Sequence, residues 1–183
     1  MNGKNHWLKL LSKRSTIVLV TMVQLVLLTG LIDDKDETTV KALFVYNFTK
    51  YIEWPEQNIS QQFRIGILGE SAINDKLSMI LKGKKIYNRT VEIKEIKSLD
   101  EIGGCQILYI TKNTSEKLKQ VLDRYSQNEM LIVTEEKNMA VKGAGINIIE
   151  KDQKIRFEMN NTAIKKAGLK VANQLYELAI VIQ

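Results

Sequence analysis

The sequence predicts an α/β fold, in which a single compact domain contains a mixed, mostly parallel sheet flanked by helices. Short apolar runs of strand length alternate with segments whose apolar residues recur at helical spacing, a pattern typical of parallel sheets. Near the C-terminus, two strand-like runs are separated only by Glu150-Lys151-Asp152-Gln153, which predicts an antiparallel β-hairpin. A long helix is expected to close the chain. Together these elements indicate a Rossmann-like arrangement.

The first expected element is a helix that begins near Val40 and stops at Trp54-Pro55. Pro55 is the only proline, and the residue before a proline is pushed out of helical geometry. We expect Asn47 on the buried face, where its amide needs hydrogen-bond partners. The apolar side chains that would share this face are Val40, Leu43, Phe44, Phe48, Tyr51 and Ile52.

Strands and helices then alternate along the chain. The expected segments are a buried strand at 63–68, a helix through Ile73, Leu77, Ile80 and Leu81, a half-buried strand at 90–94, one helical turn opened by Ser98-Leu99-Asp100-Glu101, a strand at 105–110, a helix through Leu118, Val121, Leu122 and Tyr125, and a strand at 130–133.

The hairpin and the last helix complete the predicted domain. Strands at 145–149 and 154–159 form the hairpin, with Ile155, Phe157 and Met159 facing inward. The closing helix begins near Thr162. Its Gly168 would lie in the helix interior, at a cost of about 1 kcal/mol relative to alanine.

The N-terminal residues predict a targeting segment. Lys4, Lys9, Lys13 and Arg14 precede an uncharged apolar run at 16–32, which is typical of an export signal or an N-terminal membrane anchor. We favour a cleaved signal, with a retained anchor as the alternative. Either places the domain, residues 38–183, on the far side of the membrane, because the basic flank stays cytoplasmic.

Charge and cysteine usage narrow the function classes. The net charge of +6 falls to about +2 outside residues 1–32, where 23 basic residues face 21 acidic ones, so a nucleic-acid partner is not expected. Cys105 is the only cysteine, which excludes an intramolecular disulfide. We expect it to be a buried, inert thiol.

The residues needed for common catalytic and metal sites are missing from the predicted domain. His6, the only histidine, lies in the basic flank, so no Ser-His-Asp triad and no histidine-based metal site can form. The Gly66-Ile67-Leu68-Gly69 stretch does not match a dinucleotide-binding fingerprint. The sequence therefore predicts no catalytic residues, no metal and no cofactor, and favours a binding or regulatory protein over an enzyme.

Three blocks of sequence, in this order, resemble the YfiR family of bacterial periplasmic proteins. They are KALFVYNFTKYIEWP at 41–55, FRIGILG at 63–69 with CQILYI at 105–110, and GAGINIIEKDQKIRFEMNNTAIKKAGLKVANQLYELA at 143–179. The resemblance implies a periplasmic regulator. Well-known members restrain an inner-membrane diguanylate cyclase by binding its periplasmic region, which links envelope conditions to cyclic-di-GMP and biofilm formation, and an outer-membrane lipoprotein can sequester them. Some members carry disulfide-forming cysteine pairs, which Cys105 alone cannot reproduce.

The matched motifs supply the candidate partner- or ligand-binding residues. These are Asn47, Lys50, Glu53 and Trp54 in the first block and Asn147, Arg156 and Asn160 in the last. Each also has a structural interpretation. Trp54 could fill the core, Asn47 and Asn160 could be buried or capping hydrogen-bonders, and Arg156 could be an exposed strand charge.

Two functions remain open at this point. The favoured one is an exported, non-enzymatic regulator that binds a membrane-anchored signalling protein, a diguanylate cyclase or sensor. An outer-membrane lipoprotein and a second copy of the chain are further candidate partners. The alternative is a periplasmic protein that binds a nucleotide-like or aromatic ligand beyond the carboxyl ends of the strands. Its site would be built from the loops Gly69-Glu70-Ser71, Thr111-Lys112-Asn113 and Thr134-Glu135.

Overall fold

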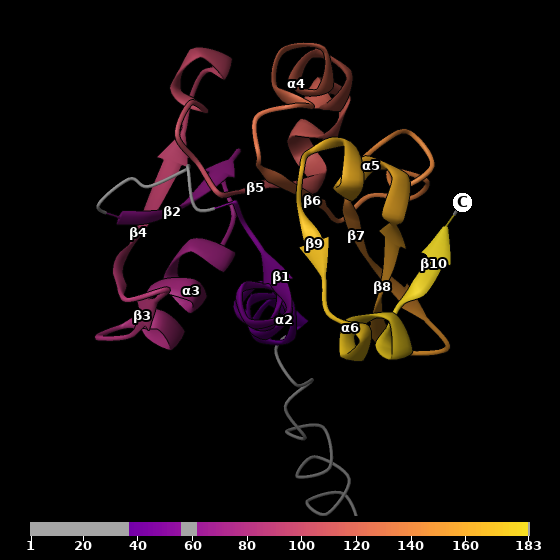
Figure 1. Ribbon diagram of the computed structural model, residues 1–183, viewed down its shortest axis with the longest axis horizontal. Helices are drawn as coiled ribbons and strands as arrows, with labels where there is room; N and C mark the ends of the chain where they lie inside the picture. Colours follow the sequence, from indigo (N-terminus) through magenta and orange to yellow (C-terminus); the bar gives the residue numbers. More distant parts are fainter. Residues whose placement is uncertain (1–36, 56–61, 183) are drawn as a thin grey trace, which may run out of the picture. The chain divides into compact units, whose positions relative to one another are not determined.

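An eight-stranded mixed sheet is the centre of the domain (Figure 1). The computed structural model describes residues 37–55 and 62–182, so the predicted export segment lies outside the described residues. The helices are α2 (Glu37–Tyr51), α3 (Ile73–Leu81), α4 (Leu118–Tyr125), α5 (Asn161–Lys166) and α6 (Asn173–Leu178), with 3₁₀ turns η1 (Leu99–Glu101) and η2 (Lys112–Lys117). The strands are β1 (Ile52–Glu53), β2 (Gln62–Leu68), β3 (Lys85–Ile86), β4 (Arg89–Ile96), β5 (Ile107–Ile110), β6 (Leu131–Thr134), β7 (Ile146–Lys151), β8 (Lys154–Asn160), β9 (Lys170–Val171) and β10 (Ile180–Ile182).

The strand order confirms the predicted mixed, mostly parallel sheet. The order is β10-β8-β7-β6-β5-β2-β4-β3, and the five strands from β7 to β4 run parallel to one another. If these five strands are renumbered 1 to 5 along the chain, their order across the sheet is 2-1-3-4-5. This is a doubly wound order, and it differs from the 3-2-1-4-5-6 order of dinucleotide-binding domains. The hairpin of β7 and β8 is antiparallel, as expected. At its tip, Asp152 and Gln153 both have positive φ, which matches the twist of a two-residue hairpin turn.

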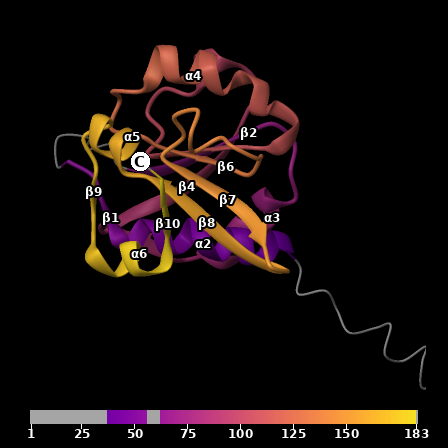
Figure 2. The same ribbon diagram turned by 90° about the vertical axis from the view of Figure 1, so that its right-hand side faces the viewer.

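Alternating side chains of the central strands build a core on each face of the sheet. Ile107 and Tyr109 of β5 belong to the cluster that contains residues of α2 and α3, whereas Leu108 and Ile110 belong to the cluster that contains residues of α4. Figure 2 shows α2 and α3 on one side of the sheet and α4 on the other. All four side chains are buried, which agrees with the absence of charged residues from this run.

Helix α2 presents a different face to the sheet from the one predicted. Its fully buried side chains are those of Ala42, Val45 and Phe48, whereas Leu43 is 43 % exposed and Asn47 is only half-buried. The helix carries apolar residues on nearly all sides, so spacing alone could not identify the buried one. The small Ala42 and Val45 lie against the sheet and leave Leu43 facing outward.

The prediction of one long C-terminal helix is wrong. Helix α5 ends at Lys166, because Gly168 adopts φ +74° and the Gly168 and Leu169 N–H groups donate to the carbonyls of Lys165 and Ile164. This Schellman motif stops the helix. The chain continues as β9, which pairs antiparallel with β1, then α6, and then β10, which lies parallel to β8 at the sheet edge.

The remaining local expectations were met with small shifts. The helical turn at Leu99–Glu101 forms, but the Ser98 side chain donates to the Glu101 carboxylate and makes no capping bond to the backbone.

In the described part of the chain, none of the helices has the length and apolar character that crossing a membrane requires.

Candidate functional site

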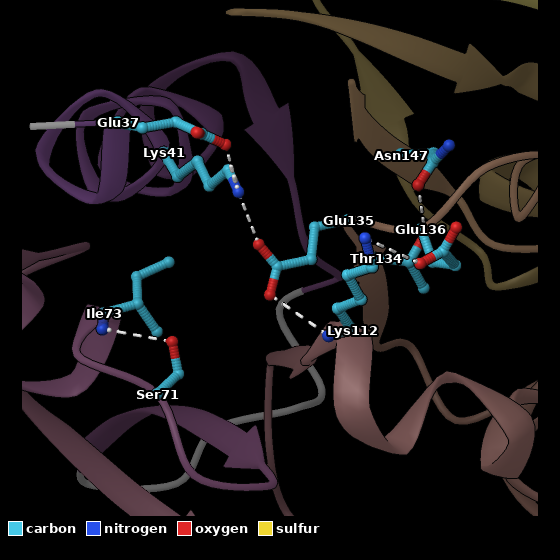
Figure 3. Close-up of polar contacts among 9 residues, drawn as sticks. All are labelled: Glu37, Lys41, Ser71, Ile73, Lys112, Thr134, Glu135, Glu136 and Asn147. Atoms are coloured by element: carbon cyan, nitrogen blue, oxygen red, sulfur yellow. Dashed lines mark hydrogen bonds and ion pairs between the residues drawn. The ribbon is translucent and has the colours of Figure 1, made fainter. Parts of the chain in front are cut away.

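The loops at the carboxyl ends of the strands meet in a polar cluster (Figure 3). The Lys41 ammonium on α2 lies 2.7 Å from the Glu135 carboxylate, which follows β6, and 2.6 Å from Glu37. The other Glu135 oxygen accepts the backbone N–H of Lys112 at 3.1 Å. The Glu135 side chain is only 12 % exposed. The cluster therefore ties α2 to the ends of β5 and β6.

The ion pairs of this cluster stabilise the fold. Burial would lower the pKa of Lys41, but its hydrogen bonds to Glu135 and Glu37 and their negative charges outweigh burial and raise it. Glu135 also lies beside the hydroxyl of Tyr109, which is fully buried. Burial first, and then the Glu135 charge, raise the pKa of Tyr109. Lys41 thus offsets one of the two carboxylate charges, and the cluster keeps a net negative charge.

The crevice between β2 and β5, where a doubly wound sheet commonly binds ligands, is filled by the protein itself. The Thr114 hydroxyl donates to the Leu68 carbonyl at 2.8 Å and lies 3.1 Å from the Thr111 hydroxyl. Both threonine side chains lie close to Gly69, where a Cβ would clash with them. The φ of Gly69, +96°, also disfavours any residue other than glycine. The predicted loops do converge here, but two threonine side chains occupy the space between them.

A small cavity beside this crevice has the wrong charge for a nucleotide. It has a volume of about 230 Å³, and three carboxylates line it, those of Glu70, Asp75 and Glu95. Fixed negative charges repel phosphate groups. The arrangement therefore does not support the nucleotide form of the alternative function at this edge.

The last motif supplies structural residues at two of its three predicted site positions. Asn147 is completely buried, accepts from Thr134 and donates to Glu158. Asn160 caps α5 by accepting the Ala163 N–H at 2.9 Å, and it donates to the Ala140 carbonyl. Arg156 is exposed on β8 and stands opposite Ile149. Asn147 pairs with Glu158, so Arg156 and Asn160, two residues on either side of Glu158, are its diagonal neighbours on the hairpin. Both asparagine side chains are hydrogen-bonded within the fold.

Two residues of the first motif, Glu53 and Trp54, line a pocket at the amino ends of the strands. The pocket has a volume of about 610 Å³ and is lined by Glu53, Trp54, Pro55, Phe63, Tyr87, Arg89, Gly168 and Lys170. The Trp54 indole packs edge-on against the rings of Phe63 and Tyr87, with centroids 5.2 and 6.3 Å away. Its N–H donates to the Gln106 carbonyl at 3.0 Å. Trp54 therefore packs against core residues and also lines the pocket.

The other two residues of that motif, Asn47 and Lys50, lie on the outward face of α2. The Lys50 ammonium donates to the Asn47 amide oxygen at 3.2 Å and lies 4.1 Å from the centre of the Tyr46 ring. The Lys84 ammonium approaches the same ring at 5.5 Å. We call Leu43, Tyr46, Asn47 and Lys50 the α2 stripe. It is an accessible surface that combines apolar, aromatic and basic groups.

Sequence reasoning missed Tyr46, Lys84 and Tyr87. Tyr87 reaches Trp54 because residues 87 and 88 form the positive-φ turn between β3 and β4, and its hydroxyl donates to the Ile52 carbonyl. These contacts join segments more than 30 residues apart, so no local pattern could have indicated them.

Comparisons with solved structures give weak similarities. A conserved domain protein from Vibrio cholerae O1 biovar El Tor N16961 has a TM-score of 0.46 and 11 % identity, covering 66 % of this chain and 54 % of that one. An ABC domain in complex with L-Trp from Streptococcus pneumoniae has a TM-score of 0.45 and 15 % identity, covering 66 % and 55 %. The chain thus spans about half the length of each.

Comparisons at the sequence level are more informative. A search of curated proteins found no match. The model of one family, described as YfiR/HmsC-like, matches residues 38–180, which is most of the chain and nearly all of the described domain. This match includes the α2 motif, the central strands, the hairpin and the segment with Gly168. The chain therefore belongs to the YfiR/HmsC-like family.

Proposed function

We propose that this protein is an exported, non-enzymatic regulator that binds a membrane-anchored signalling protein, a diguanylate cyclase or a sensor, and modulates cyclic-di-GMP-type envelope signalling. Family membership supports this function. The basic flank and apolar run of residues 1–32 support export to the periplasm, with that segment either cleaved or kept as an anchor. An outer-membrane lipoprotein would be a second partner.

The observation that carries the proposal is the α2 stripe. A helix that served only the core would bury its apolar residues and expose polar ones. On α2, Leu43 is 43 % exposed, and the Tyr46 ring lies between the ammonium groups of Lys50 and Lys84. Interface cores favour aromatic and apolar side chains with a polar rim. This surface lies on the motif that most clearly marks the family.

The charged groups at the carboxyl edge support a role other than catalysis. Lys41 and Glu135, the most buried ion pair there, bind each other across α2 and β6. Among the described residues, no cluster of three or more histidine, cysteine or acidic side chains is placed to hold a metal ion.

The pocket around Trp54 supports a second function, the binding of an aromatic ligand. Three rings, those of Trp54, Phe63 and Tyr87, gather there, and Arg89 and Lys170 line the same space. Aromatic walls favour a flat apolar ligand, and basic residues favour an anionic substituent. A thermal-shift screen of aromatic acids tests this function. Stabilisation in the native protein that Trp54→Leu abolishes would support it, and no stabilisation by any aromatic acid would contradict it.

Crosslinking and affinity purification from the native host test the proposed regulator. The wild-type protein is expected to capture an inner-membrane signalling protein. Leu43→Glu and Lys50→Glu should each reduce the yield severalfold, because they place a negative charge in the contact. Lys151→Glu, on the exposed hairpin tip, is the matched control and should capture the partner normally. Failure of the wild type to capture any envelope protein would contradict the proposal.

A further inference from the structure

The central sheet opens between β6 and β7. These strands pair at only two positions, Val133 with Ile146 and Thr134 with Asn147, so Leu131 and Ile132 at the start of β6 have no partner in β7. Gly145 and the Ile164 side chain of α5 stand beside that opening. A Cβ on Gly145 would lie 3.2 Å from both Ile164 and Leu131, so the close approach there depends on glycine.

A cavity of about 320 Å³ lies here, lined by residues of α4 and α5 and by the start of β6. Its apolar walls come from both core clusters: Leu122, Met130 and Ile132 belong to the α4 side, and Ile164, Ala167 and Leu169 to the other. An apolar cavity of ~150 Å³ binds benzene, so this one has room for roughly a dozen carbon atoms.

The mouth of the cavity is basic. Lys142 and Lys166 line it from two sides, with Asp123 as the single acidic residue, and all three are exposed. Asn160, Ser126 and Thr162 also line the cavity with neutral polar groups, and the Asn160 amide already accepts from Ala163 and donates to Ala140. Lys142 and Lys166 are the cationic groups of the lining, so they select the charge of a ligand's polar group.

We infer that this cavity binds an apolar monocarboxylate, with the hydrocarbon body between α4 and α5 and the carboxylate at Lys142 and Lys166. Two lysines face the single carboxylate of Asp123 at this mouth, so the excess positive charge favours an anionic head group over an uncharged or cationic one. The site shares no residue with the α2 stripe or with the Trp54 pocket. It is independent of the proposed partner binding and is tested without a partner.

Decanoate is a suitable probe, because its tail matches the cavity volume. Titration of the domain, followed by methyl NMR and by thermal shift, should show saturable binding and an increased Tm. The perturbed methyl groups should be those of Leu122, Ile164 and Leu169, and not those of Ile65 or Ile67. Decanol and decyltrimethylammonium carry the same tail. Each should bind with an affinity at least about tenfold lower than that of decanoate.

Two kinds of variant separate the cavity from nonspecific hydrophobic binding. The double variant Lys142→Glu/Lys166→Glu should weaken decanoate about tenfold and remove its advantage over decyltrimethylammonium. Ala163→Leu, at a half-buried position on the cavity wall, should block binding while the circular dichroism spectrum stays native. Lys151→Glu/Lys154→Glu on the hairpin is the control and should bind as wild type.

Several results would overturn the inference. These are equal affinity for decanoate and the cationic probe, a perturbed Trp54 indole N–H signal with the methyl groups of Leu122, Ile164 and Leu169 unchanged, and unchanged binding in a folded Ala163→Leu variant. Absence of decanoate binding in the wild-type domain would overturn it as well.

Discussion

The hydroxyl of Tyr109 is the one buried side-chain polar atom without a hydrogen-bond partner among the described residues. It lies beside the Glu135 carboxylate, whose oxygens already accept from Lys41 and Lys112. Other buried polar groups, such as those of Thr134, Asn147 and Asn160, are satisfied within the fold. At the scale of single residues, therefore, Tyr109 stores an uncompensated desolvation cost.

Replacing Tyr109 with phenylalanine tests this interpretation. We expect the free energy of unfolding to stay unchanged or to rise by about 1 kcal/mol, because the change removes an unpaired buried hydroxyl. Tyr125→Phe is the control: the Tyr125 hydroxyl donates to the Leu99 carbonyl at 2.8 Å, and its loss should cost about 1 kcal/mol. Chemical denaturation measures both. A loss of more than about 1.5 kcal/mol in Tyr109→Phe would show that the hydroxyl bonds to Glu135.

Cys105 predicts a specific dependence of stability on pH. Burial is the main reason that the pKa of its thiol rises from 9.0 to about 11. Between these values the unfolded chain releases a proton that the folded protein keeps, so stability falls as the pH rises from 9 to 11. The loss is up to about 3 kcal/mol.

Urea denaturation of the wild type and Cys105→Ala across this pH range measures the effect. The difference between the two unfolding free energies should shrink or reverse as the pH rises, because the variant has no thiol to titrate. Lys41 and the tyrosines titrate in both proteins, so their contributions cancel. Parallel curves from pH 8 to 11 would mean that the Cys105 thiol is not shifted.

At the scale of elements, the C-terminal segment shows how a long-range pairing overrides a helical pattern. Ile164, Val171, Leu175, Leu178 and Ile182 are spaced as on a single helix. Gly168 interrupts that helix, and Lys170 and Val171 pair with the strand that follows α2. The pairing buries the end of the α2 motif, a gain that no local pattern along residues 161–182 reveals.

Gly168→Ala distinguishes the observed turn from the helix that the pattern predicts. At φ +74°, alanine should lower the unfolding free energy by about 1–2 kcal/mol. If Gly168 lay inside a continuous helix, alanine would instead raise the unfolding free energy by about 1 kcal/mol. Gly103→Ala is the control, since a Cβ there meets no atom within 4 Å and its φ is ordinary; it should change stability by less than about 0.5 kcal/mol. Thermal or urea unfolding gives the sign directly.

The central strands could be predicted from the sequence, because their apolar runs are short, continuous and bounded by glycine or polar residues. The face of α2 could not, because a helix that is apolar on most sides carries no periodic signal. The site was predicted in part: Glu53 and Trp54 line one pocket, but Phe63, Tyr87 and Lys84 join Trp54 and Tyr46 only through tertiary contacts. Asn147 and Asn160 were predicted as binding residues with a structural role as the alternative, and the structure gives them hydrogen bonds that hold the fold.

At the scale of the whole domain, the two faces of the sheet differ in what they offer. On one face, α2 exposes the stripe of Leu43, Tyr46, Asn47 and Lys50. Where the sheet opens between β6 and β7, α4 and α5 enclose a cavity with a basic mouth. The carboxyl edge between them is closed by the Lys41–Glu135 pair and by Thr114. This division separates the proposed partner surface on α2 from the proposed ligand cavity between α4 and α5.

Site-specific photocrosslinking in the native host tests the central claim, that the α2 stripe contacts a membrane signalling protein. A photoreactive residue would replace Leu43, with Lys151 on the hairpin tip as the matched position. The account predicts a crosslinked inner-membrane signalling protein from position 43 and none from position 151. Equal crosslinking from both positions, or a partner captured only from position 151, would contradict it.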